Sequence, residues 1–203
     1  EICDRYGILL ILDEVMCGMG RTGTLFACEQ DGIVPDIATI AKGLGAGYQP
    51  VGAMLCSAAI YAAIEKGTGF FQHGHTYIGH PMAMAAAGAV LTRLTDGQTL
   101  PQVIATGERL KAGLQDRFGQ HPHIGDIRGK GLFLGLELVR DRDGKTPFDP
   151  ALKLHKKVKA AAMEAGLMCY PMGGTIDGRQ GDHILLAPPL ILTEDQIGEL
   201  VDK

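Results

Sequence analysis

Short, uninterrupted apolar runs alternate with glycine-rich loops through the first half of the chain. Ile8–Leu12 is wholly apolar and closes on Asp13. Asp36–Ile40 leads to Lys42 in the same way, and Val51–Cys56 follows. Wholly apolar runs of this length are typical of strands buried on both faces, as in a parallel sheet. The pattern therefore predicts three strands of an α/β sheet, separated by loops such as Gly18–Gly23.

Helical patterns follow these strands, and the character of the chain changes near residue 97. Before that point we expect helices over Ala58–Lys66 and from Pro81 to Leu94, joined by a loop. After it, Leu100–Phe118 carries Val103, Leu110 and Leu114 on one face. The remaining elements predicted are a turn over Ile124–Gly131, strands over Leu132–Val139, Leu167–Tyr170 and Ile184–Ala187, a helix over Leu152–Glu164 stopped by Gly166, and a polar loop over Gly173–Asp182. We predict an α/β domain over residues 1–97 and an α+β domain over 98–203.

Composition narrows the class of protein. The chain has 203 residues, is 46% hydrophobic and carries a net charge of -4, so it has neither the composition of a disordered chain nor the basic excess of a nucleic-acid binder. Its 29 glycines follow no three-residue period, which excludes collagen. No uninterrupted apolar stretch reaches about 18 residues, so we predict no membrane-spanning helix. Both ends look cut, and we treat the sequence as a piece of a larger protein.

The cysteines are odd in number and form no Cys-x-x-Cys pair. The five are Cys3, Cys17, Cys28, Cys56 and Cys169. They stand in apolar stretches, where a thiol commonly serves as a small core residue. Unpaired cysteines are usual in reducing compartments, and we therefore predict a cytoplasmic protein.

Two residues at predicted strand ends carry the candidate chemistry. Asp13 follows a buried strand, and ligands of open α/β sheets gather at the carboxyl ends of strands. Lys42 stands between apolar residues and Gly43, at a junction where partial burial would lower its pKa and make its amine nucleophilic. Asp13 could instead be a cap or turn residue, and Lys42 a snorkelling surface lysine. Together they suit a pyridoxal phosphate site, where a lysine holds the aldehyde and an acid pairs with the ring nitrogen.

Five ordered motifs make the sequence resemble one family. Leu9–Gly23 is similar to the Asp-Glu-Val segment of the class III pyridoxal-phosphate aminotransferases, and Pro35–Leu44 to their lysine motif. His73–Pro81 resembles the loop that precedes their long Ala-rich helix. Asp126–Leu132 and Ala187–Leu190 match landmarks of their small domain.

The resemblance implies a fold and a set of residue roles. The fold expected is fold-type I, with 1–97 as the carboxyl-terminal part of the large mixed-sheet domain and 98–203 as the small α+β domain, truncated at its end. Lys42 is the expected Schiff-base lysine and Asp13 the partner of the pyridine nitrogen. Val15 is expected to pack on the ring face, with core packing as the alternative. Thr76 is expected to bind the cofactor phosphate across a homodimer interface, so that the active site is shared.

The resemblance indicates the substrate-binding residues less completely. Relatives place a carboxylate-binding arginine just before the final Pro-Pro motif, where this sequence has Tyr170-Pro171. Arg179, in the nearby polar loop, could take that role or be a solvated loop charge. The motifs favour the ω-amino acid:pyruvate branch, so the implied function is transfer of an amino group from an amine or ω-amino acid to a 2-oxo acid such as pyruvate. Two alternative functions use the same fold, an aminomutase and a decarboxylase. A third alternative is a truncated, non-catalytic dimerisation domain.

Several other features are given structural interpretations. His73, His75 and His80 lack the spacing of a helical metal site, so we predict no metal. Gly18-Met-Gly20 lacks the lysine and hydroxyl residue of a phosphate loop and is interpreted as a structural loop. Arg128 is expected to form an ion pair or to cap the turn at Asp126–Gly129. The upstream phosphate turn and ring-stacking aromatic of the family are not found in these residues, so we do not expect this piece alone to form a stable holoenzyme.

Overall fold

The computed structural model describes residues 1–203, which form two compact units, Glu1–Leu100 and Pro101–Lys203. The boundary that we predict at residue 97 lies in the turn between helix α3 (Pro81–Leu94) and helix α4 (Thr99–Phe118). The units are described one at a time.

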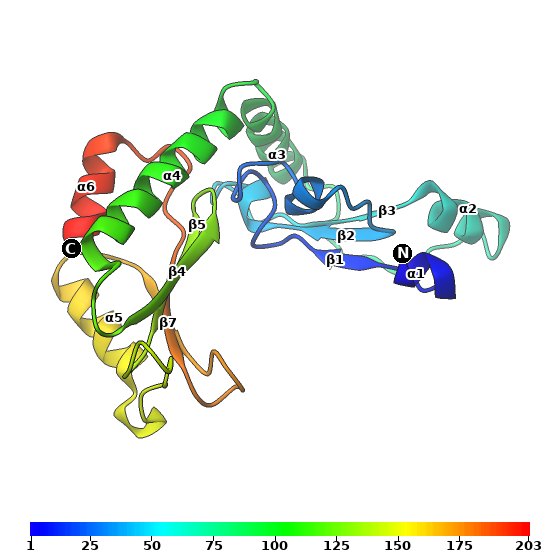
Figure 1. Cartoon of the computed structure of the whole chain (residues 1–203). Coiled ribbons are helices and arrows are strands. Elements are labelled where there is room, and N and C mark those ends of the chain that lie inside the picture. Colours follow the sequence, from blue (N-terminus) through cyan, green and yellow to red (C-terminus); the bar gives the residue numbers. More distant parts are fainter. The chain divides into compact units, whose positions relative to one another are not determined.

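The first unit contains a three-stranded mixed sheet (Figure 1). Strands β1 (Ile11–Asp13) and β2 (Ile37–Ile40) pair in parallel, and β3 (Ala53–Cys56) pairs antiparallel with β2. Its other elements are α1 (Ile2–Tyr6), the 3-10 turns η1 (Ala27–Asp31) and η2 (Lys42–Leu44), α2 (Ala58–Lys66) and α3. The predicted helix over Ala58–Lys66 and the one from Pro81 to Leu94 are both confirmed.

Local chemistry explains where the two longer helices of this unit begin. The Ser57 hydroxyl accepts a hydrogen bond from the amide of Ile60, capping α2. Pro81 occupies the first turn of α3, where its missing N–H costs nothing. Ala83 and Ala87 are buried on α3. These small side chains allow α3 to pack closely against η2, the turn that contains Lys42.

The prediction that the first strand is buried on both faces is wrong. β1 begins only at Ile11, and the side chain of Ile11 is 60% exposed, as are those of Ile8 and Leu9 to a similar degree. β1 is an edge strand of the sheet, so it has a neighbouring strand on one side alone. The central strand β2 does bury Ala38 and Ile40. Burial of the two faces of a strand depends on the segments that pack over them, which the apolar run does not encode.

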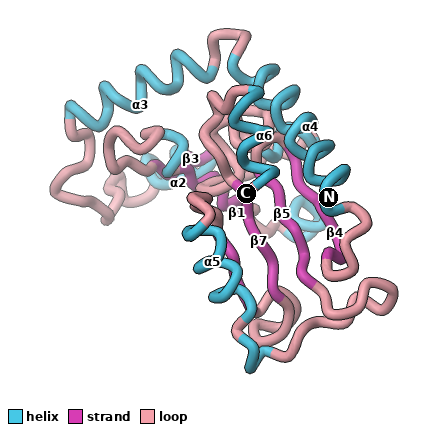
Figure 2. Tube along the Cα trace, turned by 90° about the vertical axis from the view of Figure 1, so that its left-hand side faces the viewer, coloured by secondary structure: helices cyan, strands magenta, loops and turns pink.

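The second unit is a four-stranded antiparallel sheet with helices on one face (Figure 2). The strands lie in the order β4 (Ile124–Lys130), β5 (Phe133–Leu138), β7 (Asp182–Leu186) and β6 (Tyr170–Gly173). The helices are α4, α5 (Leu154–Glu164) and α6 (Glu194–Asp202), with a 3-10 turn, η3 (Pro150–Leu152), before α5.

The core of this unit lies between the sheet and its helices. Leu134, Leu136 and Leu138 alternate inward along β5, and the predicted face of α4 meets them. The buried cluster comprises Val103, Leu110, Leu114, Ile124, Ile127, Leu132, Leu134, Leu136, Leu138, Leu186, Leu192 and Ile197. Gly107 lets α4 approach the backbone of Gly131 so closely that a side chain there would overlap the Gly131 carbonyl.

Two of the predicted elements in this unit are wrong. The segment predicted as a turn over Ile124–Gly131 is strand β4, because β5 supplies a hydrogen-bonding partner along it. The strand predicted at Leu167–Tyr170 instead begins at Tyr170, where pairing with β7 starts. Arg128 forms the predicted ion pair, with its Nη1 3.0 Å from Asp126 Oδ2 and 2.6 Å from Glu137 Oε2. Glu137 stands on β5, so this contact joins the two strands.

The cysteines do not lie in the buried core. All five carry free thiols; Cys56 is exposed and the others are partly buried. Cys169 packs against the buried cluster of the second unit, as expected of a small core residue, whereas the exposed Cys56 does not serve that role. None of the helices has the length and apolar character needed to cross a membrane.

Candidate active site

Asp13 and Lys42 lie at the same edge of the first sheet. β1 and β2 run in parallel, so their carboxyl ends share an edge. Asp13 ends β1 opposite Thr39, and Lys42 opens η2 just beyond the end of β2. Both side chains are exposed, so the predicted partial burial of the Lys42 amine is wrong.

The Asp13 carboxylate is held on one side. Its Oδ1 accepts a hydrogen bond from the amide of Val15 at 3.0 Å and faces the Thr39 hydroxyl at 3.5 Å. Its Oδ2 has no hydrogen-bond partner in the protein. Asp13 is thus a turn residue that also presents a free carboxylate oxygen, and the two interpretations of this position are compatible.

Glu14 is a buried acid that the sequence analysis missed. Its side chain is only 2% exposed and accepts hydrogen bonds from the amides of Ala27 (2.8 Å) and Cys28 (2.9 Å) and from the Cys17 thiol (3.4 Å). Burial alone raises the pKa of Glu14, but these hydrogen bonds outweigh it and hold the pKa below its ordinary value. Burial and the adjacent carboxylate raise the pKa of Cys17 to about 11, so this thiol is a protonated donor.

The effect of Glu14 is to close a loop. Its carboxylate binds the first turn of η1, while its carbonyl accepts the Gly18 amide at 2.9 Å. The acid itself is visible in the sequence after the apolar run that ends β1. Its partners are backbone amides about a dozen residues away, and no sequence pattern marks backbone amides.

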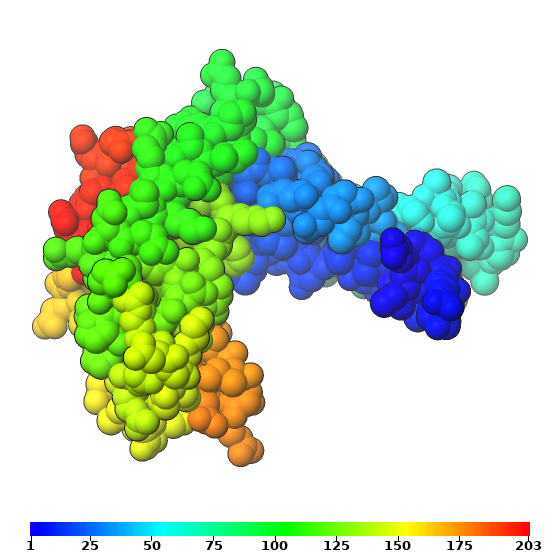
Figure 3. Space-filling model, viewed as in Figure 1, coloured from blue at the N-terminus to red at the C-terminus, as the bar shows by residue number.

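Val15 and Thr76 occupy different parts of the first unit. Val15 is half-buried beside Asp13, at the edge that carries Lys42. Thr76 is exposed in the loop between α2 and α3 and makes no hydrogen bond to Asp13, Val15 or Lys42. Figure 3 shows α2 and the chain that follows it, in teal, standing out from the rest of this unit. The structure therefore brings together three of the four predicted cofactor residues.

The three histidines of this loop pack with aromatic rings. Ring centroids lie 5.9 Å apart for His73 and Phe71, 6.0 Å for His75 and Tyr77, and 6.2 Å for His80 and Tyr77. The His75 Nδ1 also accepts a hydrogen bond from the Tyr77 amide at 3.2 Å. No group of three His, Cys, Asp or Glu side chains in the chain is arranged to hold a metal ion.

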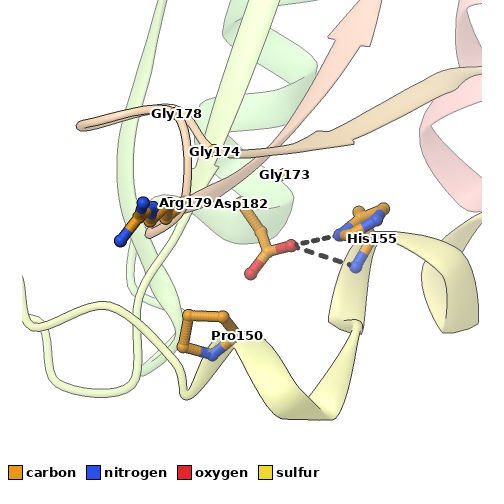
Figure 4. A pocket seen from close by; sticks show the side chains of 7 residues that line it. All are labelled: Pro150, His155, Gly173, Gly174, Gly178, Arg179 and Asp182. Carbon is orange, nitrogen blue, oxygen red and sulfur yellow. Dashed lines mark hydrogen bonds and ion pairs between the residues drawn. The ribbon is translucent and has the colours of Figure 1, made fainter.

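Arg179 lies in the second unit, on the exposed loop between β6 and β7. It lines a pocket of about 250 Å³ with His155 and Asp182 (Figure 4). Asp182 is buried, and its Oδ1 lies 2.8 Å from His155 Nδ1 and accepts the His155 amide at 3.2 Å. Asp182 therefore fastens the first turn of α5 to β7. The Arg179 side chain makes no such contact and is exposed.

A second, more apolar pocket of about 260 Å³ lies at the other end of these strands. Tyr170 and the Ala187-Pro188-Pro189 motif line it together. Its other lining residues are Leu167, Met168, Cys169, Leu185, Leu186 and Leu200. Tyr170, at the position compared with the arginine of the family, thus places a phenol beside apolar side chains.

Comparison with known proteins decides the family. The family model for class-III aminotransferases matches residues 1–203, the whole chain. The chain belongs to this family. An uncharacterized aminotransferase of Schizosaccharomyces pombe, C1771.03c, is 45% identical over 202 residues, which cover 100% of this chain and 44% of the relative. This class-III chain thus spans less than half the length of the curated relative.

Solved structures of transaminases share the fold. An (S)-enantioselective omega-transaminase from Thermomicrobium roseum superposes with a TM-score of 0.88 at 40% identity, covering 99% of this chain and 43% of that one. An amine transaminase from an uncultivated Pseudomonas species, solved in its PLP-bound form, gives 0.87 at 40% identity, covering 99% and 44%. The prediction of an α/β fold-type I transferase is confirmed, and the family implies pyridoxal phosphate (PLP) as cofactor.

The residues of the first sheet fit that cofactor. An aldehyde requires a primary amine, which Lys42 supplies, and a protonated pyridine nitrogen requires an anionic partner. Asp13 offers an oxygen without a partner at the same sheet edge as Lys42. In this class-III chain, Lys42 and Asp13 therefore offer the groups that the aldehyde and the ring nitrogen of the cofactor require.

Proposed function

We propose that this chain carries the lysine-bearing part of an aminotransferase active site. The reaction is transfer of an amino group from an amine or ω-amino acid to a 2-oxo acid such as pyruvate. The observation that carries this proposal is the placement of Asp13 and Lys42 at the carboxyl ends of adjacent parallel strands in a class-III chain. Residues 1–97 belong in this proposal to the large PLP-binding domain and 98–203 to the small domain.

Each residue at the sheet edge has a separate task. Lys42 would hold the cofactor aldehyde as the Schiff-base lysine, and its amine, when free, would accept and return the proton of the substrate carbon. Asp13 uses its free oxygen to keep the pyridine nitrogen protonated, while its other oxygen stays on the Val15 amide. Val15 packs on the ring face. The bound cofactor supplies an electron sink for the bond that breaks at the substrate carbon.

The phosphate and substrate contacts come from elsewhere in the chain. We propose that Thr76 donates its hydroxyl to the cofactor phosphate of a partner subunit, in a homodimer with shared active sites. The exposed apolar rings of Phe70 and Tyr77 beside it support an interface at this loop. Arg179 is the candidate ligand for a substrate carboxylate, supported by its free guanidinium.

The location of the protein is part of the same proposal. All five cysteines carry free thiols, the state that a reducing compartment maintains. We therefore propose that the protein works in the cytoplasm.

An assay on the whole protein tests the proposed reaction. Purified protein loaded with PLP is mixed with pyruvate and a panel of amines and ω-amino acids, and alanine formation is followed. We expect alanine in amounts matching the ketone or aldehyde produced from the donor. Carbon dioxide release or a rearranged amine without alanine would identify a decarboxylase or an aminomutase. A folded dimer in which borohydride fixes no PLP on Lys42 would identify a non-catalytic domain.

Mixing two impaired variants tests the shared site. Thr76→Ala alone should weaken PLP binding by about 1–3 kcal/mol, the value of a lost hydrogen bond to a charged group. A mixed dimer of Lys42→Ala and Thr76→Ala chains has one doubly damaged site and one with both native residues. Activity of the mixture should therefore rise above that of either variant, measured after subunit exchange is verified with differently tagged chains. No rise despite exchange would place Thr76 in its own subunit's site or outside it.

A further inference from the structure

Two unusual backbone conformations lie close together, one at the proposed catalytic lysine and one at Met19. Lys42 has φ +42° and Met19 has φ +53°. Both values lie in the left-handed backbone region, which residues other than glycine rarely adopt. Gly43, directly after Lys42, lies against Met19. A methyl group at Gly43 would lie 2.8 Å from Met19 Cβ and 3.3 Å from the Met19 carbonyl oxygen. The two turns are therefore in backbone-level contact.

Met19 is held firmly on its own side of this contact. Its side chain is 1% exposed, and its amide donates a hydrogen bond to the Leu25 carbonyl at 2.7 Å. The Gly20 amide likewise donates to the Thr24 carbonyl. Glu14 closes the base of this loop through the amides of η1 and Gly18, as described above. The Met19 side chain and backbone are therefore both held in place.

The lysine turn is enclosed from its other sides as well. Leu44, the last residue of η2, is buried, and α3 packs against η2 through a face that buries Ala83 and Ala87. The Leu44 amide donates to the Ala41 carbonyl at 2.9 Å, and the Gly45 amide to the Lys42 carbonyl at 3.1 Å. Backbone strain persists only where the surroundings over-determine it. Here the surroundings are Met19, α3 and the buried Leu44.

We propose that Met19 is a positioning residue, which fixes the left-handed turn at Lys42 through its contact with Gly43 and so directs the lysine amine toward the cofactor aldehyde. This inference rests on the proposed role of Lys42. The loop Gly18–Gly23 accordingly has a task beyond connecting β1 to η1. In this proposal Met19 and Gly43 act through the backbone of Lys42.

The matched substitution is Gly43→Ala, which adds one methyl group at the contact. Its φ is not in the left-handed region, so alanine is strained there only by Met19. We expect the rate at which Lys42 captures PLP, trapped by borohydride and located by peptide mapping, to fall at least about tenfold, since small misplacements of reacting groups have effects of this size. Affinity for pyridoxine 5′-phosphate, which has no aldehyde, should stay within about twofold of wild type, because noncovalent binding does not use the amine.

A second variant and a control make the result specific. Met19→Gly removes the Cβ that the new methyl meets and suits the positive φ at position 19, so Gly43→Ala with Met19→Gly should capture PLP faster than Gly43→Ala alone. Gly88→Ala, on α3 with open space around it, should behave like wild type. If Gly43→Ala does not fold, the proposal requires that the double variant folds and captures PLP. A double variant that fails in either respect would overturn the positioning role.

The outcomes separate this inference from the proposed function. Wild-type capture rates in Gly43→Ala would overturn the positioning role, as would a loss that Met19→Gly does not relieve. Equal losses of capture and of pyridoxine 5′-phosphate affinity would show a general structural defect and would also overturn it. A wild-type protein that captures no PLP on Lys42 contradicts the proposed function instead.

Discussion

Lys42→Ala in the whole protein should abolish amino transfer and covalent capture of PLP, while noncovalent PLP binding remains measurable. The reason is that Lys42 supplies the only primary amine of the proposed site, and an imine to the aldehyde requires a primary amine. Asp13, Val15 and Thr76 contact other parts of the cofactor in this proposal, so their contributions to affinity remain. The measurements are alanine formation from pyruvate, borohydride-trapped label, and PLP affinity by equilibrium dialysis.

Substitution of a second exposed lysine shows whether the effect is specific to the amine of Lys42. Lys66 is also exposed in the first unit, at the end of α2. Lys66→Ala should keep wild-type activity and labelling. Amino transfer by Lys42→Ala near the wild-type rate, or a label that maps to another lysine, would contradict the assignment.

Asp13→Asn should lower the rate of amino transfer or the PLP affinity by roughly 10- to 150-fold. The loss of a charge-assisted hydrogen bond to the ring nitrogen costs about 1.5–3 kcal/mol, and each factor of ten in rate or affinity is about 1.4 kcal/mol. Asparagine keeps an oxygen that can accept the Val15 amide, so the local turn survives. The variant therefore removes the negative charge without removing the turn.

The same site offers a direct comparison that identifies which role matters. Asp13→Ala removes both the charge and the hydrogen bond to the Val15 amide, so it should also lower the melting temperature. Asp13→Asn should leave the melting temperature close to wild type. Kinetic constants of Asp13→Asn within twofold of wild type would mean that Asp13 is a turn residue alone.

Much of the secondary structure follows from local patterns. The helix over Ala58–Lys66 has a serine cap before it and a glycine after it, and α4 has an apolar face at helical spacing. The central strand before Lys42 is apolar except for Thr39, and β2 buries its alternate residues Ala38 and Ile40. In each case the residues that decide the element are neighbours in sequence, so the pattern is sufficient. The family resemblance rests on motifs of the same local kind.

Elements that depend on a distant partner were predicted less well. β4 contains two glycines and reads as a turn, and it becomes a strand only because β5 offers a hydrogen-bonding edge and Glu137 meets Arg128. Tyr170 begins a strand because β7 lies beside it. Strand pairing joins residues far apart in the chain, and a single sequence does not state which edges will meet.

The candidate site divides in the same way. The sequence by itself determined the chemistry, an amine at Lys42 and a carboxylate at Asp13, each at the end of an apolar run, together with the family to which those motifs belong. Only the tertiary structure decided that β1 and β2 lie side by side in parallel, so that the two groups share an edge and both are exposed. It also decided that Glu14 is buried on backbone amides and that Met19 rests on Gly43. Residue types are written in the sequence, whereas burial and close approach arise when distant backbone segments pack together.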